Sequence, residues 1–171
     1  MTKNFNQSFD RGLHRVLNRL NTTLERDNLI VETTNRLRNT LCVDRVVLYY
    51  FYSQWDGQVT FECLSLSELS ILGSTGPSEC FNDEYAALYL EGRVRAISDI
   101  ESEPIADCHR DFLRNLGVRA NLVVPILTKK GLWGLLIAHH CQAPRIWTPS
   151  DVQMMQAEAE NLSQAASIRD S

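Results

Sequence analysis

Cysteine and histidine side chains carry the reactive groups of this sequence. Cys108 and His109 follow Asp107 at the start of a predicted helix, where backbone N–H groups and the helix dipole stabilise a thiolate and lower the pKa of a cysteine. Cys108 is therefore the best candidate nucleophile. Taken alone, a Cys-His pair is more often a small buried cysteine beside a surface histidine, so the rest of the sequence has to decide.

Cys80 is a second candidate thiol. It lies within Ser78-Glu79-Cys80-Phe81, in the segment 65–82, which is rich in Ser, Gly and Pro and predicts a long loop. A ligand can reach a cysteine in such a loop, although the neighbouring carboxylate raises the pKa of the thiol. Cys80 and Cys108 could therefore approach one ligand from different sides.

His139, His140 and Cys141 lie at the end of a predicted strand. Because side chains alternate along a strand, His139 and Cys141 share one face and His140 lies on the other. The three cannot bind one metal ion, and the cysteines lack the short spacing of a zinc site, so no metal site is predicted. A histidine on a central strand is a hydrogen-bonded core residue or a polar contact in a mostly apolar ligand pocket.

A cysteine hydrolase is the enzymatic alternative, with Cys108 as the nucleophile and His139 or His140 as the base. The sequence contains no nucleophile elbow, no Gly-rich phosphate loop and no His-Glu-x-x-His motif. The support for this alternative is therefore thin.

Hydrophobic periodicity predicts the helices that position these residues. Apolar residues at helical spacing indicate two N-terminal helices, with Asp27 or Asn28 capping the second. Shorter helices are predicted over 83–90 and 107–116. A last helix starts at Thr148-Pro149 and runs to the C-terminus, with an apolar face that suggests a helical partner.

Runs of β-branched and aromatic residues predict the strands. Two hairpins are expected over 46–64 and 120–140, with a short strand over 94–97 between them. The fold class is therefore α+β, with a central antiparallel sheet sandwiched by helices and with the N- and C-terminal helices packed together.

Length and composition exclude several classes of partner. The chain has 171 residues, enough for one ordinary domain, and its 17 basic and 21 acidic residues give a net charge of −4. Such a mildly acidic surface does not suit a nucleic-acid binder. No apolar run reaches transmembrane length, and the polar start does not resemble a secretory signal, so we expect a cytoplasmic protein without membrane contact, whose five cysteines are thiols.

Several segments occur in the order and spacing of one known family, namely 91–100, 108–113, 118–126, 132–141 and 144–147. Together they resemble the chromophore-binding GAF domains of cyanobacteriochromes, the compact relatives of phytochromes. The likeness covers most of the chain from about Leu13. It implies one bilin-binding GAF domain over residues 13–171, preceded by a flexible N-terminus over 1–12 and followed by an output module outside this chain.

The resemblance also implies a site. Cys108 would form a thioether with the ethylidene side chain of ring A of a linear tetrapyrrole, and His109 would pack beside the pyrroles. His139 is expected to contact the chromophore near ring D. The predicted site is completed by His140, Phe81 and Tyr85. The ligand is expected to be phycocyanobilin or its isomer phycoviolobilin, with biliverdin left open.

In one lineage of the family a second cysteine lies in an Asp-x-Cys-Phe motif, and Cys80-Phe81 stands at a similar spacing before Cys108. The resemblance implies that Cys80 adds reversibly to the carbon that bridges the two central pyrroles, which moves the absorption to the violet or blue. Ser78 replaces the Asp of the motif, so it cannot supply the carboxylate that contacts the pyrrole nitrogens in the family.

The function implied by the resemblance is that of a photoreceptor domain without catalysis of its own. Light would isomerise the double bond between rings C and D and switch the protein between a violet/blue and a green-to-orange state. The terminal helices would form a homodimer and pass strain to the output module. A GAF domain that binds a cyclic nucleotide or another small ligand is the alternative.

Overall fold

The hydrophobic spacing changes from helical to strand-like after residue 42, and the secondary structure follows this change. The computed structural model describes residues 2–53, 56–76 and 83–171. Its elements are, in chain order, α1 (Thr2–Glu25), α2 (Asn28–Leu41), β1 (Arg45–Ser53), β2 (Asp56–Leu64), the 3₁₀ helix η1 (Ser67–Leu69), α3 (Asp83–Leu90), β3 (Arg95–Ile97), α4 (Asp107–Asn115), β4 (Ala120–Thr128), β5 (Gly131–His140), α5 (Pro149–Leu162) and α6 (Ala166–Arg169).

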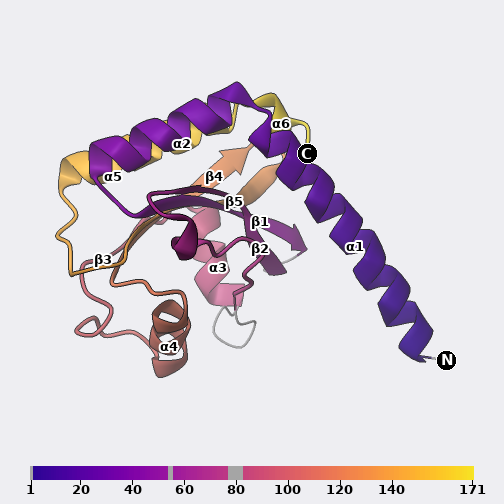
Figure 1. Cartoon of the computed structure of the whole chain (residues 1–171), viewed down its shortest axis with the longest axis horizontal. Helices are drawn as coiled ribbons and strands as arrows, with labels where there is room; N and C mark the ends of the chain where they lie inside the picture. The colour runs from indigo at the N-terminus through magenta and orange to yellow at the C-terminus, as the bar shows by residue number, and fades with distance from the viewer. Residues whose placement is uncertain (1, 54–55, 77–82) are drawn as a thin grey trace.

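The strands form one antiparallel sheet in the order β2-β1-β5-β4-β3. The predicted hairpins are β1–β2 and β4–β5, and pairing of β1 with β5 joins them in the centre of the sheet. Helices α2 and α5 cover one face, while α3 and α4 lie on the other side (Figure 1). The predicted α+β class, with a sheet sandwiched by helices, is confirmed.

The sheet separates two apolar layers, because successive side chains of a strand point to opposite faces. Val46, Leu48 and Leu136 belong to the main core, which they share with α2 and α5. The alternating residues Val47 and Leu135 belong to separate, smaller clusters on the other face. Both faces of the central strands are therefore apolar, as the continuous hydrophobic runs predicted.

Asp27 organises the layer of terminal helices. Its carboxylate caps α2 by accepting a hydrogen bond from the backbone N–H of Leu29 (3.1 Å), and it also accepts from the backbone N–H and the hydroxyl of Ser167 (3.2 and 2.7 Å). The tie to Ser167 requires the chain to turn after α5. The prediction of one continuous C-terminal helix is therefore wrong, since α5 ends at Leu162 and α6 starts anew at Ala166.

The apolar face of α5 is buried within the domain. Met155, Ala159 and Leu162 are at most 3% exposed, and α5 packs against α2 and β4. The helical partner predicted for this face is thus α2 of the same chain, and α1 likewise contacts α6.

Helix α1 starts earlier than the sequence suggested. It begins at Thr2, so it includes residues 2–12 of the segment for which we expected a flexible N-terminus. The C-terminal half of its apolar stripe is buried, with Leu17, Leu20 and Leu24 at most 7% exposed. The N-terminal half of α1 projects away from the rest of the domain (Figure 1).

Gly134 provides a test of the central strand pairing. It pairs with Tyr50 of β1, and a Cβ atom at Gly134 would overlap the carbonyl oxygen of Tyr49. We expect Gly134→Ala to lower the free energy of unfolding by about 1–3 kcal/mol, the usual cost of overpacking. Gly12→Ala is the matched control, because nothing lies within 4 Å of a Cβ there and alanine favours the helix. Urea denaturation measures both variants; an unchanged midpoint for Gly134→Ala would contradict the close approach.

Candidate ligand-binding site

A cavity lies between the sheet and the helices α3 and α4. Its floor is formed by alternating residues of the strands, and its walls come from the two helices and from the segment after η1. The lining residues are Val47, Tyr49, Phe51, Val59, Ile71, Ser74, Gly76, Tyr89, His109, Phe112, Leu113, Leu116, Asn121, Val123, Leu135, Ile137 and His139. An apolar and aromatic lining with a few polar groups is typical of a small-molecule site.

Tyr49 is a rigid part of the cavity wall. Its hydroxyl donates to the carbonyl of Gly57 (2.9 Å) and accepts from the backbone N–H of Gly76 (2.9 Å). Its ring meets that of Phe51 edge to face, with 5.4 Å between the centroids. Burial raises the pKa of Tyr49 to about 12, so the phenol stays protonated.

His139 lines the cavity from β5 and is paired with a buried arginine. The Nε of Arg45 donates to the Nδ1 of His139 (2.9 Å). Burial, and next the charge of Arg45, hold the pKa of His139 well below its usual range. A neutral imidazole of such low basicity is a poor general base at neutral pH, which counts against the cysteine-hydrolase alternative.

His109 lines the cavity from the opposite side, in the first turns of α4. Burial lowers the pKa of His109 to about 4, and the positive charges of Arg95 and Arg93 act in the same direction. Both cavity histidines are therefore uncharged at neutral pH.

Cys108 lies in the first turn of α4, exposed and directly before His109. Its sulfur takes part in a disulfide, so the expectation that all five cysteines are thiols is wrong. A thioether at this position would therefore require the sulfur to be reduced first.

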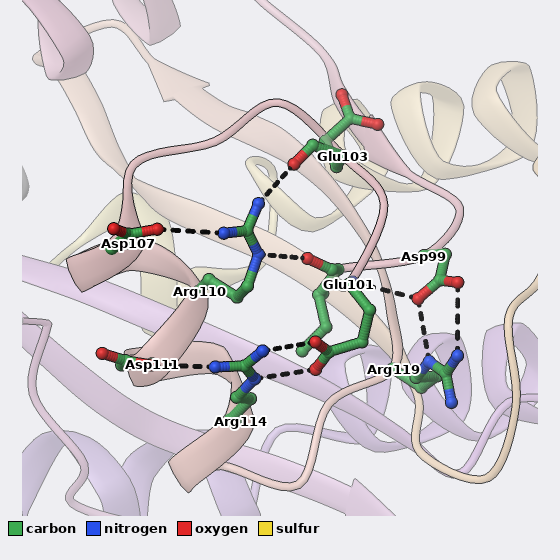
Figure 2. Close-up of polar contacts among 9 residues, drawn as sticks. Asp99, Glu101, Glu103, Asp107, Arg110, Asp111, Arg114 and Arg119 are labelled. Atoms are coloured by element: carbon green, nitrogen blue, oxygen red, sulfur yellow. Dashed lines mark hydrogen bonds and ion pairs between the residues drawn. The ribbon is translucent and has the colours of Figure 1, made fainter.

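Arg110 holds the start of α4 against the preceding loop. Its guanidinium donates to the carbonyls of Ile100 (2.8 Å) and Glu103 (2.7 Å) and to the carboxylate of Asp107 (3.1 Å). Figure 2 shows Arg110 between Glu103 and Asp107. Because two of the three acceptors are backbone carbonyls, the contact fixes the path of the loop and, with it, the place of Cys108.

Two further arginines extend this network (Figure 2). Arg114 pairs with both Glu101 and Asp111, and Arg119 pairs with Asp99 at 2.8 Å. These pairs are partly or largely exposed, so each adds little stability on its own. Arg110 and Arg114 thus connect α4 to the loop, and Arg119 connects the same loop to the start of β4.

The structure brings some of the predicted site residues together and leaves others apart. His109 and His139 line one cavity, and Cys108 adjoins it through His109. The Nδ1 of His140 is hydrogen-bonded to the carbonyl of Ala143 (2.7 Å), and His140 is not among the cavity residues. As predicted, the two neighbouring histidines of β5 serve opposite faces.

The remaining predicted site residues are only partly described. Cys80, Ser78 and Phe81 lie outside the described residues. Tyr85 is part of α3.

Sequence reasoning missed Arg45 and Asn121. Arg45 is 1% exposed and Asn121 is 4% exposed, and both are strand residues paired in register with His139. The only available signal was a polar residue at the start of an otherwise apolar run, which is also the normal appearance of a strand end. Strand register, which a single sequence does not give, is what places them beside His139.

The described part of the chain has neither a candidate metal site nor a candidate membrane span. Within it, no group of three His, Cys, Asp or Glu side chains is arranged to hold a metal ion. None of its helices combines the length and apolarity needed to cross a membrane.

Curated relatives include proteins of cyanobacteria. A protein of Picosynechococcus sp. (strain ATCC 27264 / PCC 7002 / PR-6) is 51% identical over 154 residues, which cover 90% of this chain and 94% of that protein. The circadian input-output histidine kinase CikA of Synechocystis sp. is 32% identical over 176 residues. The match covers 90% of this chain and 24% of that protein. The chain therefore spans nearly all of one relative and about a quarter of the other.

Solved structures with a similar fold include GAF domains of cyanobacteriochromes and phytochromes. The cyanobacteriochrome receptor PixJ, in its dark and illuminated states, has a TM-score of 0.74 and 31% identity, covering 84% of this chain and 95% of that one. The blue-light-absorbing form of the Thermosynechococcus elongatus PixJ GAF domain has a TM-score of 0.70 and 30% identity, covering 80% and 83%. A phycocyanobilin-bound GAF domain from a cyanobacterial phytochrome has a TM-score of 0.69 and 28% identity, covering 90% and 94%.

These likenesses confirm the resemblance to cyanobacteriochrome GAF domains that the sequence motifs predicted. The sequence profile of the GAF domain family matches residues 25–166, which extend from the end of α1 to the start of α6. On this match, over most of its length, the chain belongs to the GAF domain family.

Proposed function

We propose that this chain is a photoreceptor domain that covalently binds a linear tetrapyrrole and switches reversibly between two light-absorbing states. The observation that carries the proposal is the position of Cys108, directly before a histidine that lines an apolar and aromatic cavity. The likeness to the cyanobacteriochrome receptor PixJ and to a phycocyanobilin-bound GAF domain of a cyanobacterial phytochrome supports it.

The described residues fit such a ligand. A long conjugated tetrapyrrole needs flat apolar contacts, which Tyr49, Tyr89 and Phe112 can provide, and a few polar partners for its ring nitrogens and terminal carbonyls. His109 and His139 are neutral polar groups on opposite sides of the cavity. When bound, the tetrapyrrole supplies visible absorption and a double bond between rings C and D that light can isomerise.

Cys108 attaches the ligand in this proposal. Its reduced thiol adds across the ethylidene double bond of ring A, so that one S–C bond and one C–H bond form and nothing leaves. His109 keeps the adjoining space dry and uncharged, and His139 contacts the ligand near ring D. Phycocyanobilin or its isomer phycoviolobilin is the ligand we propose.

Cys80 is the second thiol in this proposal, as a residue of the segment outside the described residues. It would add reversibly to the carbon between the two central pyrroles and produce the violet or blue state, while the other state absorbs green to orange light. Ser78, in place of an aspartate, leaves the pyrrole nitrogens without that carboxylate. Phe81 and Tyr85 would contribute contacts around this centre, whereas His140 lies outside the cavity.

The proposed role is sensory, in the cytoplasm, without catalysis by this domain. Changed contacts of ring D would bias the terminal helices, which contact one another through α1 with α6 and α2 with α5. The helices would form a homodimer and pass the change to an output module in a longer protein.

Removing the attachment thiol tests the proposal. The wild-type protein, produced in a host that makes phycocyanobilin and purified under reducing conditions, is expected to be coloured and to switch reversibly on illumination. Cys108→Ala is expected to lose all pigment that survives denaturation, because the thioether cannot form. Cys42→Ala is the matched control, since Cys42 is an exposed free cysteine outside the cavity, and it should keep the pigment. Zinc-enhanced fluorescence of denaturing gels measures the attachment.

A colourless wild-type protein with ample bilin in the host would overturn the proposed function. The alternative of a GAF domain for a cyclic nucleotide or another small ligand would then be tested by binding assays with the apoprotein. That ligand should be retained by Cys108→Ala.

Cys80→Ala tests the second thiol. We expect the variant to keep covalent pigment and reversible photoswitching but to lose the violet or blue band, because the conjugated system is no longer divided. Cys63→Ala serves as the control thiol. Absorption spectra in both illuminated states provide the measurement, and a blue band that persists in Cys80→Ala would count against the adduct.

The neutral cavity histidines give the apoprotein a defined pH dependence. Their folded pKa values lie below the ordinary value, so the unfolded chain binds protons below about pH 6.5 that the folded protein does not. The free energy of unfolding is therefore expected to fall as the pH drops below this value, by up to about 1.4 kcal/mol per pH unit for His139. Urea denaturation between pH 7.5 and 5 should show a flatter slope in His139→Gln, whereas His14→Gln in the exposed part of α1 should keep the wild-type slope. Equal slopes in wild type and His139→Gln would contradict a neutral buried His139.

A further inference from the structure

Three polar side chains form one row across three neighbouring strands of the sheet. Arg45 of β1 pairs in register with His139 of β5, which pairs in turn with Asn121 of β4. They are 1%, 3% and 4% exposed, respectively. His139 and Asn121 both line the cavity, so two of the three side chains face the space where a ligand would lie.

The contact with Arg45 decides which nitrogen of His139 carries the proton. A guanidinium is always protonated and can only donate, so the Nδ1 of His139 must accept with its lone pair. The proton of the neutral imidazole is then on Nε2. Among the described residues, none accepts a hydrogen bond from this Nε2–H.

Asn121 offers the complementary group. Its Oδ1 is buried and has no hydrogen-bond partner within the described ranges. A buried carbonyl oxygen without a donor costs free energy comparable to a lost hydrogen bond. A ligand group that carries an N–H would satisfy it.

We propose that Arg45 is a positioning residue that fixes His139 as the Nε2–H tautomer, so that this donor and the Oδ1 of Asn121 form a pair for one lactam group. A lactam has its N–H and C=O side by side, and it needs one acceptor and one donor at neighbouring positions. The terminal rings of a linear tetrapyrrole are lactams. The inference rests on the proposed function for its ligand, whereas the tautomer is a property of the apoprotein.

Arg45 also has a structural role. The test must therefore distinguish this role from its effect on the tautomer of His139. Its Nη1 donates to the carbonyl of Leu69 (2.7 Å), and its Nη2 donates to the carbonyl of Leu116. Replacing Arg45 thus removes three hydrogen bonds, and a loss of stability alone would not distinguish the two roles. The tautomer of His139 distinguishes them, because a residue with a purely structural role would not determine which ring nitrogen carries the proton.

The first experiment is a long-range ¹H–¹⁵N correlation spectrum of the apoprotein labelled at its four histidines. His139→Gln assigns the signal of His139. We expect the wild type to show an unprotonated Nδ1 and a protonated Nε2, and Arg45→Met to show a mixture of tautomers. A wild-type His139 protonated on Nδ1, or on both nitrogens, would overturn the proposal even if Arg45→Met fails to fold. An unchanged tautomer in a folded Arg45→Met variant would do the same.

The second experiment tests the lactam pair with phycocyanobilin as the probe. In a Cys108→Ala background binding is reversible, and Asn121→Leu is expected to raise the Kd about 2- to 10-fold, the factor that corresponds to one hydrogen bond of about 0.5–1.5 kcal/mol. Thr33→Val is the matched control, because the hydroxyl of Thr33 is also buried without a partner among the described residues but is not part of the cavity.

The outcomes of the second experiment separate the two proposals. Equal Kd values for Asn121→Leu and Thr33→Val would overturn the role of Asn121 while leaving bilin binding intact. If the wild-type chain binds no phycocyanobilin, the proposed function fails, and the lactam pair fails with it. The tautomer measurement then still decides the role of Arg45.

Discussion

A buried positive charge, the guanidinium of Arg45, is the constraint around which the cavity side of this domain is arranged. Burial lowers the pKa of Arg45, while negative charges nearby, including those of Glu62 and Asp44, act in the opposite direction. A buried charge is tolerated only when its hydrogen-bonding groups find partners. Here the partners come from three elements: the ring of His139 on β5, the carbonyl of Leu69 in η1 and the carbonyl of Leu116, the C-cap of α4.

The same charge fixes one end of the helix that carries the candidate thiol. The C-terminus of a helix has a partial negative charge, so α4 is favourably placed with Leu116 against Arg45. At its other end, Arg110 ties α4 to the carbonyls of Ile100 and Glu103. A helix held at both ends keeps Cys108 and its neighbouring histidine in a set position over the cavity, which lowers the entropic cost of ordering a ligand there.

Local patterns were sufficient to predict most of the elements, because their signals lie within a few residues. Thr148 and Asp151 form the capping box of α5, and Asp27 caps α2, both at predicted helix starts. The alternation of a strand was enough to assign His139 and His140 to opposite faces. The break between α5 and α6 was not predictable in this way, since it depends on a hydrogen bond between Asp27 and Ser167, which are far apart in the sequence. Arg45 was missed for the same reason, because its role arises from register with β5.

The sheet lies between the cavity and the terminal helices. A structural change in the cavity can therefore reach these helices only through the sheet. Strand β1 belongs to both layers, with Val47 on the cavity side and Val46 in the core under α2. In a close-packed domain a side-chain movement on one face reaches the other only if the strand itself shifts. A shift that displaces α2 also acts on α6, because Asp27 is bonded to the first turn of both helices. The two ends of the chain are therefore expected to respond together, as one helical layer, to whatever occupies the cavity.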